Sequence, residues 1–127
     1  HALNGGAGPV NYTELVEQYP DVKVVFAHFG AEAEGIMMAK KYNSVYLDTT
    51  GVPSSKIRVA IDSAGSGKVL FGMDSPIGFR TKEGPYKPEY RTFKKAIDEI
   101  KALGLNEVDL EEIFHKNTTM VFNIRLK

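Results

Sequence analysis

The sequence contains no cysteine, so the protein can form neither a disulfide bond nor a thiolate-bound zinc site. Histidine, aspartate and glutamate remain as the strong metal ligands. No stretch approaches the ~20 consecutive apolar residues of a membrane-spanning helix, and no segment has the charged-then-apolar pattern of a signal peptide. These absences favour a cytoplasmic protein that does not act at a membrane.

An excess of charge of either sign is also missing. The 16 basic residues are matched by 16 acidic residues, which leaves no net charge to attract nucleic acid or an anionic membrane surface. A small-molecule substrate is the expected partner. The length of 127 residues predicts a single domain, residues 1–127, and the histidine at position 1, where a methionine is usual, indicates part of a longer protein.

Strand-like and helix-like segments alternate along the chain. Apolar runs predict strands buried on both faces at 22–28, 44–50 and 68–72. Helices are predicted at 11–19, at 31–42, from Ser54 or Ser55 to Gly65, around 90–100 with Gly104 beyond the end, from Asp109 through Phe114, and in a last turn or two at 117–124. The spacing of helix capping boxes occurs twice, in Asn11 with Glu14 and in Asp109 with Glu112.

Strands separated by helices are parallel, because each connection is long enough to cross back over the sheet. The chain is therefore predicted to be an α/β protein, either an open doubly wound sheet or a (β/α)8 barrel. Both architectures place their chemistry at the carboxyl ends of the strands. His28 ends the first predicted strand, Asp48, Thr49 and Thr50 end the second, and Asp74 follows the third.

Two of these polar residues are the candidates for chemistry. A histidine at a strand end, such as His28, is by itself more often a structural residue. Asp74 follows a buried strand, where a carboxylate must be paired, hydrogen-bonded or bound to a metal; capping the turn at Pro76 is the structural alternative. Because both lie at the carboxyl ends of strands of one parallel sheet, they are expected to converge on a Zn²⁺ or Mn²⁺ ion that activates water. Asp48 and Thr50 either line that pocket or cap the following turn.

Four stretches resemble the closing portion of the metal-dependent amidohydrolases, in the amidohydrolase-related group that includes carboxylate decarboxylases. They are PDVKVVFAHFG, YNSVYLDTTG, GKVLFGMDSP and DLEEIFHKNTTMVF. His28-Phe29-Gly30 is similar to the family's strand-six motif, and Gly72, Asp74 and Pro76 match the strand-eight motif. His1 resembles the histidine that ends strand five, and Asn117 to Phe122 resembles the terminal helix. Met73 and Ser75 depart from the family pattern, which bears on the substrate more than on the metal.

The resemblance implies a fold and a set of roles. The chain would be the C-terminal part of a (β/α)8 barrel, strands six to eight with the end of strand five. His1 and Asp74 would be metal ligands, and His28 either a ligand or the acid/base for the substrate. Asp74 could also accept a proton from the metal-bound water. The family's His-x-His pair is absent, and a barrel needs ~250 residues, so the chain by itself is expected to have little activity.

The expected activity is that of a metal-dependent hydrolase in which activated water attacks an amide, ester or lactone carbon. Zinc is the expected metal and manganese the alternative. Nonoxidative decarboxylation, with His28 managing the proton, is the rival reaction, and a non-catalytic α/β binding module is the rival from another class. Arg80 and Tyr86, in the loop after the third strand, could bind a substrate carboxylate. Open sheet edges would pair with another copy or with the missing N-terminal half.

Overall fold

The computed structural model describes residues 8–73 and 90–125 of the chain. Its centre is a parallel sheet of three strands in the order β1-β2-β3, which is also their order in the sequence. The strands are β1 (Val24–Phe26), β2 (Val45–Asp48) and β3 (Val69–Leu70). Val25 lies opposite Tyr46, and Leu47 lies opposite Val69. The predicted α/β class with parallel strands is thus confirmed.

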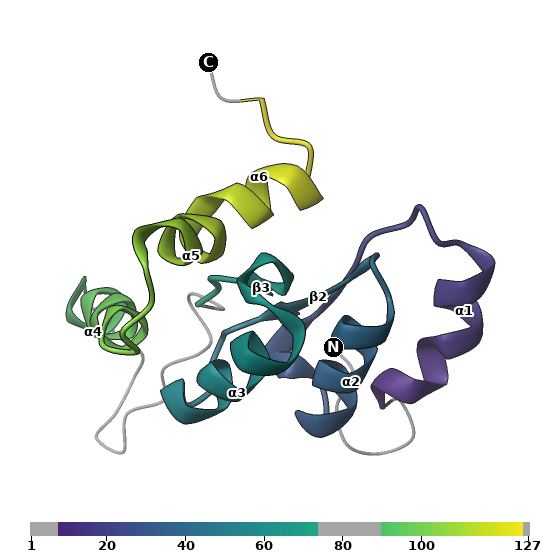
Figure 1. Cartoon of the computed structure of the whole chain (residues 1–127), viewed down its shortest axis with the longest axis horizontal. Coiled ribbons are helices and arrows are strands. Elements are labelled where there is room, and N and C mark those ends of the chain that lie inside the picture. The colour runs from purple at the N-terminus through teal and green to yellow at the C-terminus, as the bar shows by residue number, and fades with distance from the viewer. Residues whose placement is uncertain (1–7, 74–89, 126–127) are drawn as a thin grey trace.

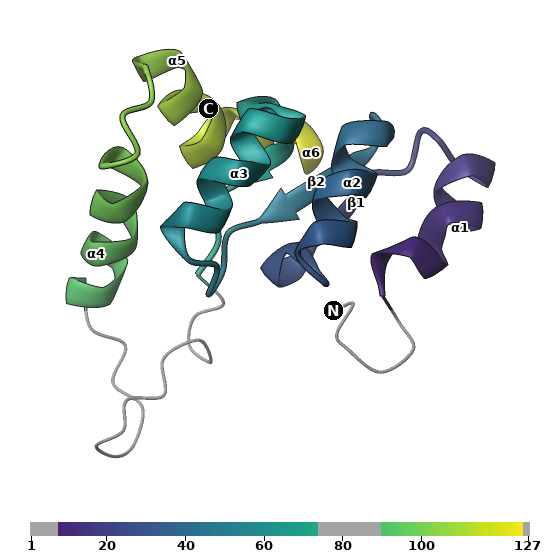
Figure 2. The ribbon, with the colours of Figure 1, turned by 60° about the horizontal axis from the view of Figure 1, so that its bottom comes forward.

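Helices surround the sheet. They are η1 (Pro9–Tyr12), α1 (Thr13–Gln18), η2 (Ala27–Phe29), α2 (Ala33–Lys41), α3 (Ser54–Ala64), η3 (Ser66–Lys68), α4 (Tyr90–Lys101), α5 (Glu107–Glu111), the π-helical turn η4 (Glu112–Lys116) and α6 (Asn117–Val121). Helices α2 and α3 lie over the sheet, whereas α1 and α4 lie at opposite ends of the molecule (Figures 1 and 2). None of the helices in the described ranges is long and apolar enough to cross a membrane.

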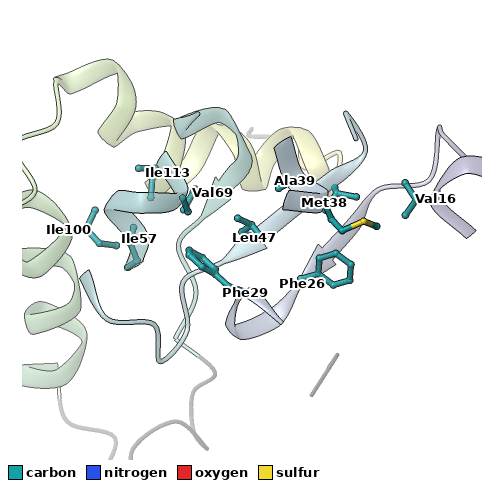
Figure 3. Close-up of a cluster of buried hydrophobic side chains, with 12 residues drawn as sticks. Val16, Phe26, Phe29, Met38, Ala39, Leu47, Ile57, Val69, Ile100 and Ile113 are labelled. Carbon is teal, nitrogen blue, oxygen red and sulfur yellow. The ribbon is translucent and has the colours of Figure 1, made fainter. Parts of the chain in front are cut away.

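The core lies between the sheet and these helices. Alternate strand residues point to the same face, so Val45, Leu47 and Val69 all point toward one layer. Figure 3 shows the cluster that they join, which also contains Phe29 from the turn after β1 and Met38 from α2. All five side chains are buried. Burying one such aliphatic or aromatic side chain contributes roughly 1.5–3 kcal/mol, so this cluster fixes how the strands and helices pack.

The predicted helix positions are confirmed, but both predicted capping boxes are wrong. Asn11 lies inside η1, which already begins at Pro9 after Gly8, so the first helical segment starts earlier than the box places it. At α5 the cap is Asn106, whose side chain accepts a hydrogen bond of 2.9 Å from the Asp109 N–H. Asp109 is therefore in the first turn of the helix and does not cap it.

The outer edge of β3 is occupied by the C-terminal helices. The Phe71 N–H donates to the Ile113 carbonyl of η4 at 2.9 Å. The Asn117 Nδ2 group donates to the carbonyls of Ser66 and Val69, each at 2.8 Å. The expectation of two open sheet edges is therefore wrong for β3, because the chain's own C-terminal segment covers that edge.

Asn117→Asp is expected to lower the free energy of unfolding by about 3 kcal/mol, since two buried carbonyls lose their donor and face a carboxylate. Urea unfolding measures this loss. Asn123→Asp is the matched control, because Asn123 is exposed and its left-handed backbone, φ 50°, also suits aspartate. An equal loss in the two variants would contradict the assigned role of Asn117.

Candidate functional site

His28 lies in a strained turn, not on a strand as predicted. Strand β1 ends at Phe26, and the next residues form η2. His28, Phe29 and Gly30 have successive positive φ angles of 56°, 58° and 63°. Positive φ is uncommon for a histidine and costly for a residue as bulky as phenylalanine. Strand β1 therefore runs into a left-handed turn, and this turn sets the direction of the imidazole.

Tight packing holds this turn in place. The Phe29 side chain is 0% exposed in the core. Its carbonyl oxygen faces Gly35 of α2, where a Cβ atom would lie only 1.9 Å away. The Gly30 N–H also donates to the Ala27 carbonyl at 2.9 Å. The strained backbone thus persists because α2 can approach it only at a glycine.

A backbone carbonyl helps to fix the orientation of the His28 ring. Its Nδ1 atom lies 2.8 Å from the Thr50 oxygen, which can only accept, so Nδ1 carries the proton. In the neutral ring the lone pair is then on Nε2. Gly51, with φ 65°, completes the turn that presents this carbonyl, and the Val52 N–H closes the turn on the Thr49 carbonyl at 3.0 Å. Metal-ligating histidines commonly have their second nitrogen bonded in this way.

The end of β2 is linked in turn to the end of β3. The Asp48 Oδ1 atom accepts a hydrogen bond of 2.6 Å from the Thr50 N–H. The Asp48 carboxylate lies against Gly72, where a Cβ atom would be 2.3–2.5 Å from its atoms. The Gly72 N–H donates to the Thr49 Oγ1 atom at 3.1 Å. Of the two roles considered for Asp48, lining a pocket or capping the turn, the structure shows the turn cap, and the contact with Gly72 is an additional finding.

These contacts gather His28, Asp48 and Gly72 at the carboxyl edge of the sheet, where the chemistry was predicted. The other predicted site residues lie outside the described residues: His1, Asp74, Arg80 and Tyr86. Within 8–73 and 90–125, no three histidine, aspartate or glutamate side chains come together as a metal site. Of the three proposed metal ligands, His1, His28 and Asp74, the described residues therefore include His28 alone. Its Nδ1 proton is used by the Thr50 carbonyl, an arrangement that fits a metal ligand or a general base.

A pocket of about 270 Å³ lies beside this edge. Most of its lining is apolar and comes from the ends of β2 and β3, from α3 and from α4, with Glu99 as the charged member: Thr49, Gly51, Val52, Pro53, Ile57, Phe71, Gly72, Met73, Ala96, Glu99 and Ile100. Gly51 and Gly72 border both this pocket and the histidine site. The sequence gives no sign of this pocket, because its walls come from segments that only the fold brings together.

Two solved structures share this architecture. The dihydroxybenzoic acid decarboxylase of Polaromonas sp. JS666, solved with manganese and 2-nitroresorcinol, has a TM-score of 0.64 at 17% identity over 89% of this chain and 37% of its own. The putative 2-pyrone-4,6-dicarboxylic acid hydrolase of Pseudomonas putida has a TM-score of 0.66 at 18% identity over 94% and 49%. The chain thus spans less than half the length of either protein, and at such identities the likeness shows the fold alone.

Sequence comparison gives the family directly. No curated protein matches the chain. The family model described as amidohydrolase matches residues 7–124, which is nearly the whole chain. This match confirms the resemblance drawn from the motifs around His28, Asp48 and Gly72. The chain belongs to the amidohydrolase family.

Proposed function

We propose that residues 1–127 form one C-terminal part-barrel of a (β/α)8 enzyme, and that the whole enzyme is a metal-dependent hydrolase. The observation that supports the proposal is the His28 ring, which lies just after β1 at the carboxyl edge of a parallel sheet and whose Nδ1–H donates to the Thr50 carbonyl. Strands from outside residues 1–127, in the same protein or in a second copy, would complete the barrel, and pairing with β3 would require η4 and α6 to move away from its outer edge. A small organic molecule would be the substrate.

His28 would hold or move a proton at Nε2. As the alternative to that role, it would join Asp74 and His1 in holding a divalent cation, zinc first and manganese as the second choice, which would supply the Lewis acidity that activates water. Arg80 and Tyr86 would bind a carboxylate of the substrate. In hydrolysis Nε2 would accept a proton from the attacking water and return it to the leaving group.

Nonoxidative decarboxylation is the second candidate. It is favoured by the structural likeness to a decarboxylase solved with manganese. In that reaction the carboxylate leaves as carbon dioxide. His28, first protonated at Nε2 by a substrate hydroxyl or by solvent, would give that proton to the carbon from which the carboxylate left. The same histidine geometry serves both reactions, so the substrate and the products distinguish them.

Chelation is expected to abolish activity, and Zn²⁺ or Mn²⁺ to restore it. The assay uses the longest natural form of the protein, treated with a chelator and then reloaded, with 2-pyrone-4,6-dicarboxylate and dihydroxybenzoates as probes. Ring opening of the pyrone supports the hydrolase, and release of carbon dioxide supports the decarboxylase. A protein that binds neither metal in calorimetry would overturn both and favour the non-catalytic binding module.

A further inference from the structure

We propose that Asp48 is a positioning residue for His28 and acts through the backbone of Thr50. The inference rests on the proposed function only for its importance to catalysis, because the contacts themselves are structural. The Asp48 carboxylate accepts the Thr50 N–H at 2.6 Å, and the Thr50 carbonyl accepts the His28 Nδ1–H at 2.8 Å. One residue therefore receives a hydrogen bond from the imidazole and gives another to the carboxylate.

The two bonds involve different peptide units, so Asp48 acts on the geometry of Thr50 and not by polarising its carbonyl. The Asp48 contact fixes the peptide before Thr50. The turn closed by the Val52 N–H and the Thr49 carbonyl, with Gly51 at φ 65°, fixes the peptide after it. Because the peptide groups on both sides of the Thr50 Cα atom are held, the Thr50 carbonyl keeps a single orientation, pointing toward the histidine ring.

The position of the Asp48 carboxylate depends in turn on Gly72. A side chain at position 72 would place its Cβ atom within 2.5 Å of the carboxylate, so the observed rotamer requires glycine there. The hydrogen bond from the Gly72 N–H to Thr49 Oγ1 holds the end of β3 beside β2. The ends of all three strands thus contribute to the orientation of one imidazole.

This role needs a hydrogen-bond acceptor at position 48 and not a negative charge. Asparagine supplies that acceptor through its side-chain oxygen, whereas alanine does not. A metal ligand or a general base at this position would need the carboxylate itself. The Asp48→Asn variant therefore separates positioning from direct chemistry.

The test is the tautomer of His28, read from ¹⁵N–¹H correlation spectra of the chelator-treated, longest natural form of the protein. The spectra are recorded about two pH units above the ordinary histidine pKa of ~6.5. His28→Asn assigns the signal. Wild type and Asp48→Asn are expected to have the proton on Nδ1. In Asp48→Ala the share of the Nε2–H tautomer is expected to rise about five- to tenfold, the equivalent of one lost hydrogen bond.

Two further variants make the result decisive. Gly72→Ala displaces the carboxylate without removing it and is expected to behave like Asp48→Ala. Asp62→Ala removes an exposed carboxylate that pairs with Arg58 on α3, and it is expected to leave the tautomer unchanged. The proposal is overturned if Asp48→Ala or Gly72→Ala retains the wild-type tautomer, or if Asp48→Asn loses it. These spectra need no metal, so a protein that binds none would refute the proposed function and leave this result standing.

Discussion

Gly35→Ala should destabilise the protein by about 3 kcal/mol or more, although alanine is normally the better helix former. The Cβ atom would lie 1.9 Å from the Phe29 carbonyl oxygen, which is backbone and cannot rotate away. Either α2 moves off the sheet or the left-handed turn at His28 opens. Both outcomes expose core side chains, and urea unfolding measures the loss.

Gly67→Ala is the matched control for this prediction. Gly67 lies in η3, and its nearest neighbour, the Glu112 Oε2 atom, would be 3.8 Å from the new Cβ atom. The change in unfolding free energy should stay within about 1 kcal/mol. Equal stabilities of the Gly35 and Gly67 variants would show that α2 does not hold the His28 turn.

His28→Asn should lower kcat/KM of the whole enzyme by about 10²–10⁴-fold, the usual contribution of a general acid or base. Asparagine is chosen because it tolerates the left-handed backbone, φ 56°, better than most residues, so the loss reports on the imidazole and not on the turn. The measurement compares turnover of the metal-loaded variant with its bound metal content. Loss of the metal would assign His28 as a ligand, whereas retention with lost turnover would assign it as the acid/base.

His115→Asn is the control for His28→Asn, since His115 is exposed in η4. Its activity should equal that of the wild type. If the His28 variant is also fully active with metal bound, the imidazole takes no part in the reaction, and the role of this edge of the sheet must be assigned again.

The order of helices and strands could be predicted because strands that are buried on both faces of a sheet appear in the sequence as continuous apolar runs. The apolar runs around Val25, Leu47 and Val69 located all three strands, and Gly65 correctly marked the end of α3. Strand ends were less predictable. Strand β1 stops at Phe26. The turn that follows depends on a contact between Phe29 and Gly35, which the pattern of neighbouring residues in the sequence does not predict.

The candidate site was predicted only in part. The placement of His28 at the carboxyl edge follows from the parallel topology, which the sequence order implies. The link from Asp48 to Gly72 could not be predicted, since it depends on the absence of a Cβ atom across two neighbouring strands. The helix caps show the same limit: Asn106 competes with Asp109 for the same helix start, and spacing alone does not decide between them.

The covered edge of β3 has a consequence for self-association. Exposed strand edges are the usual templates on which further chains add and aggregate. On this side an approaching molecule meets η4 and α6, because Ile113 and Asn117 already use the backbone groups that an added strand would need. Among the strands of the described ranges, a further strand would therefore add first to the outer side of β1, and pairing with β3, which a closed barrel needs, would require η4 and α6 to leave that edge.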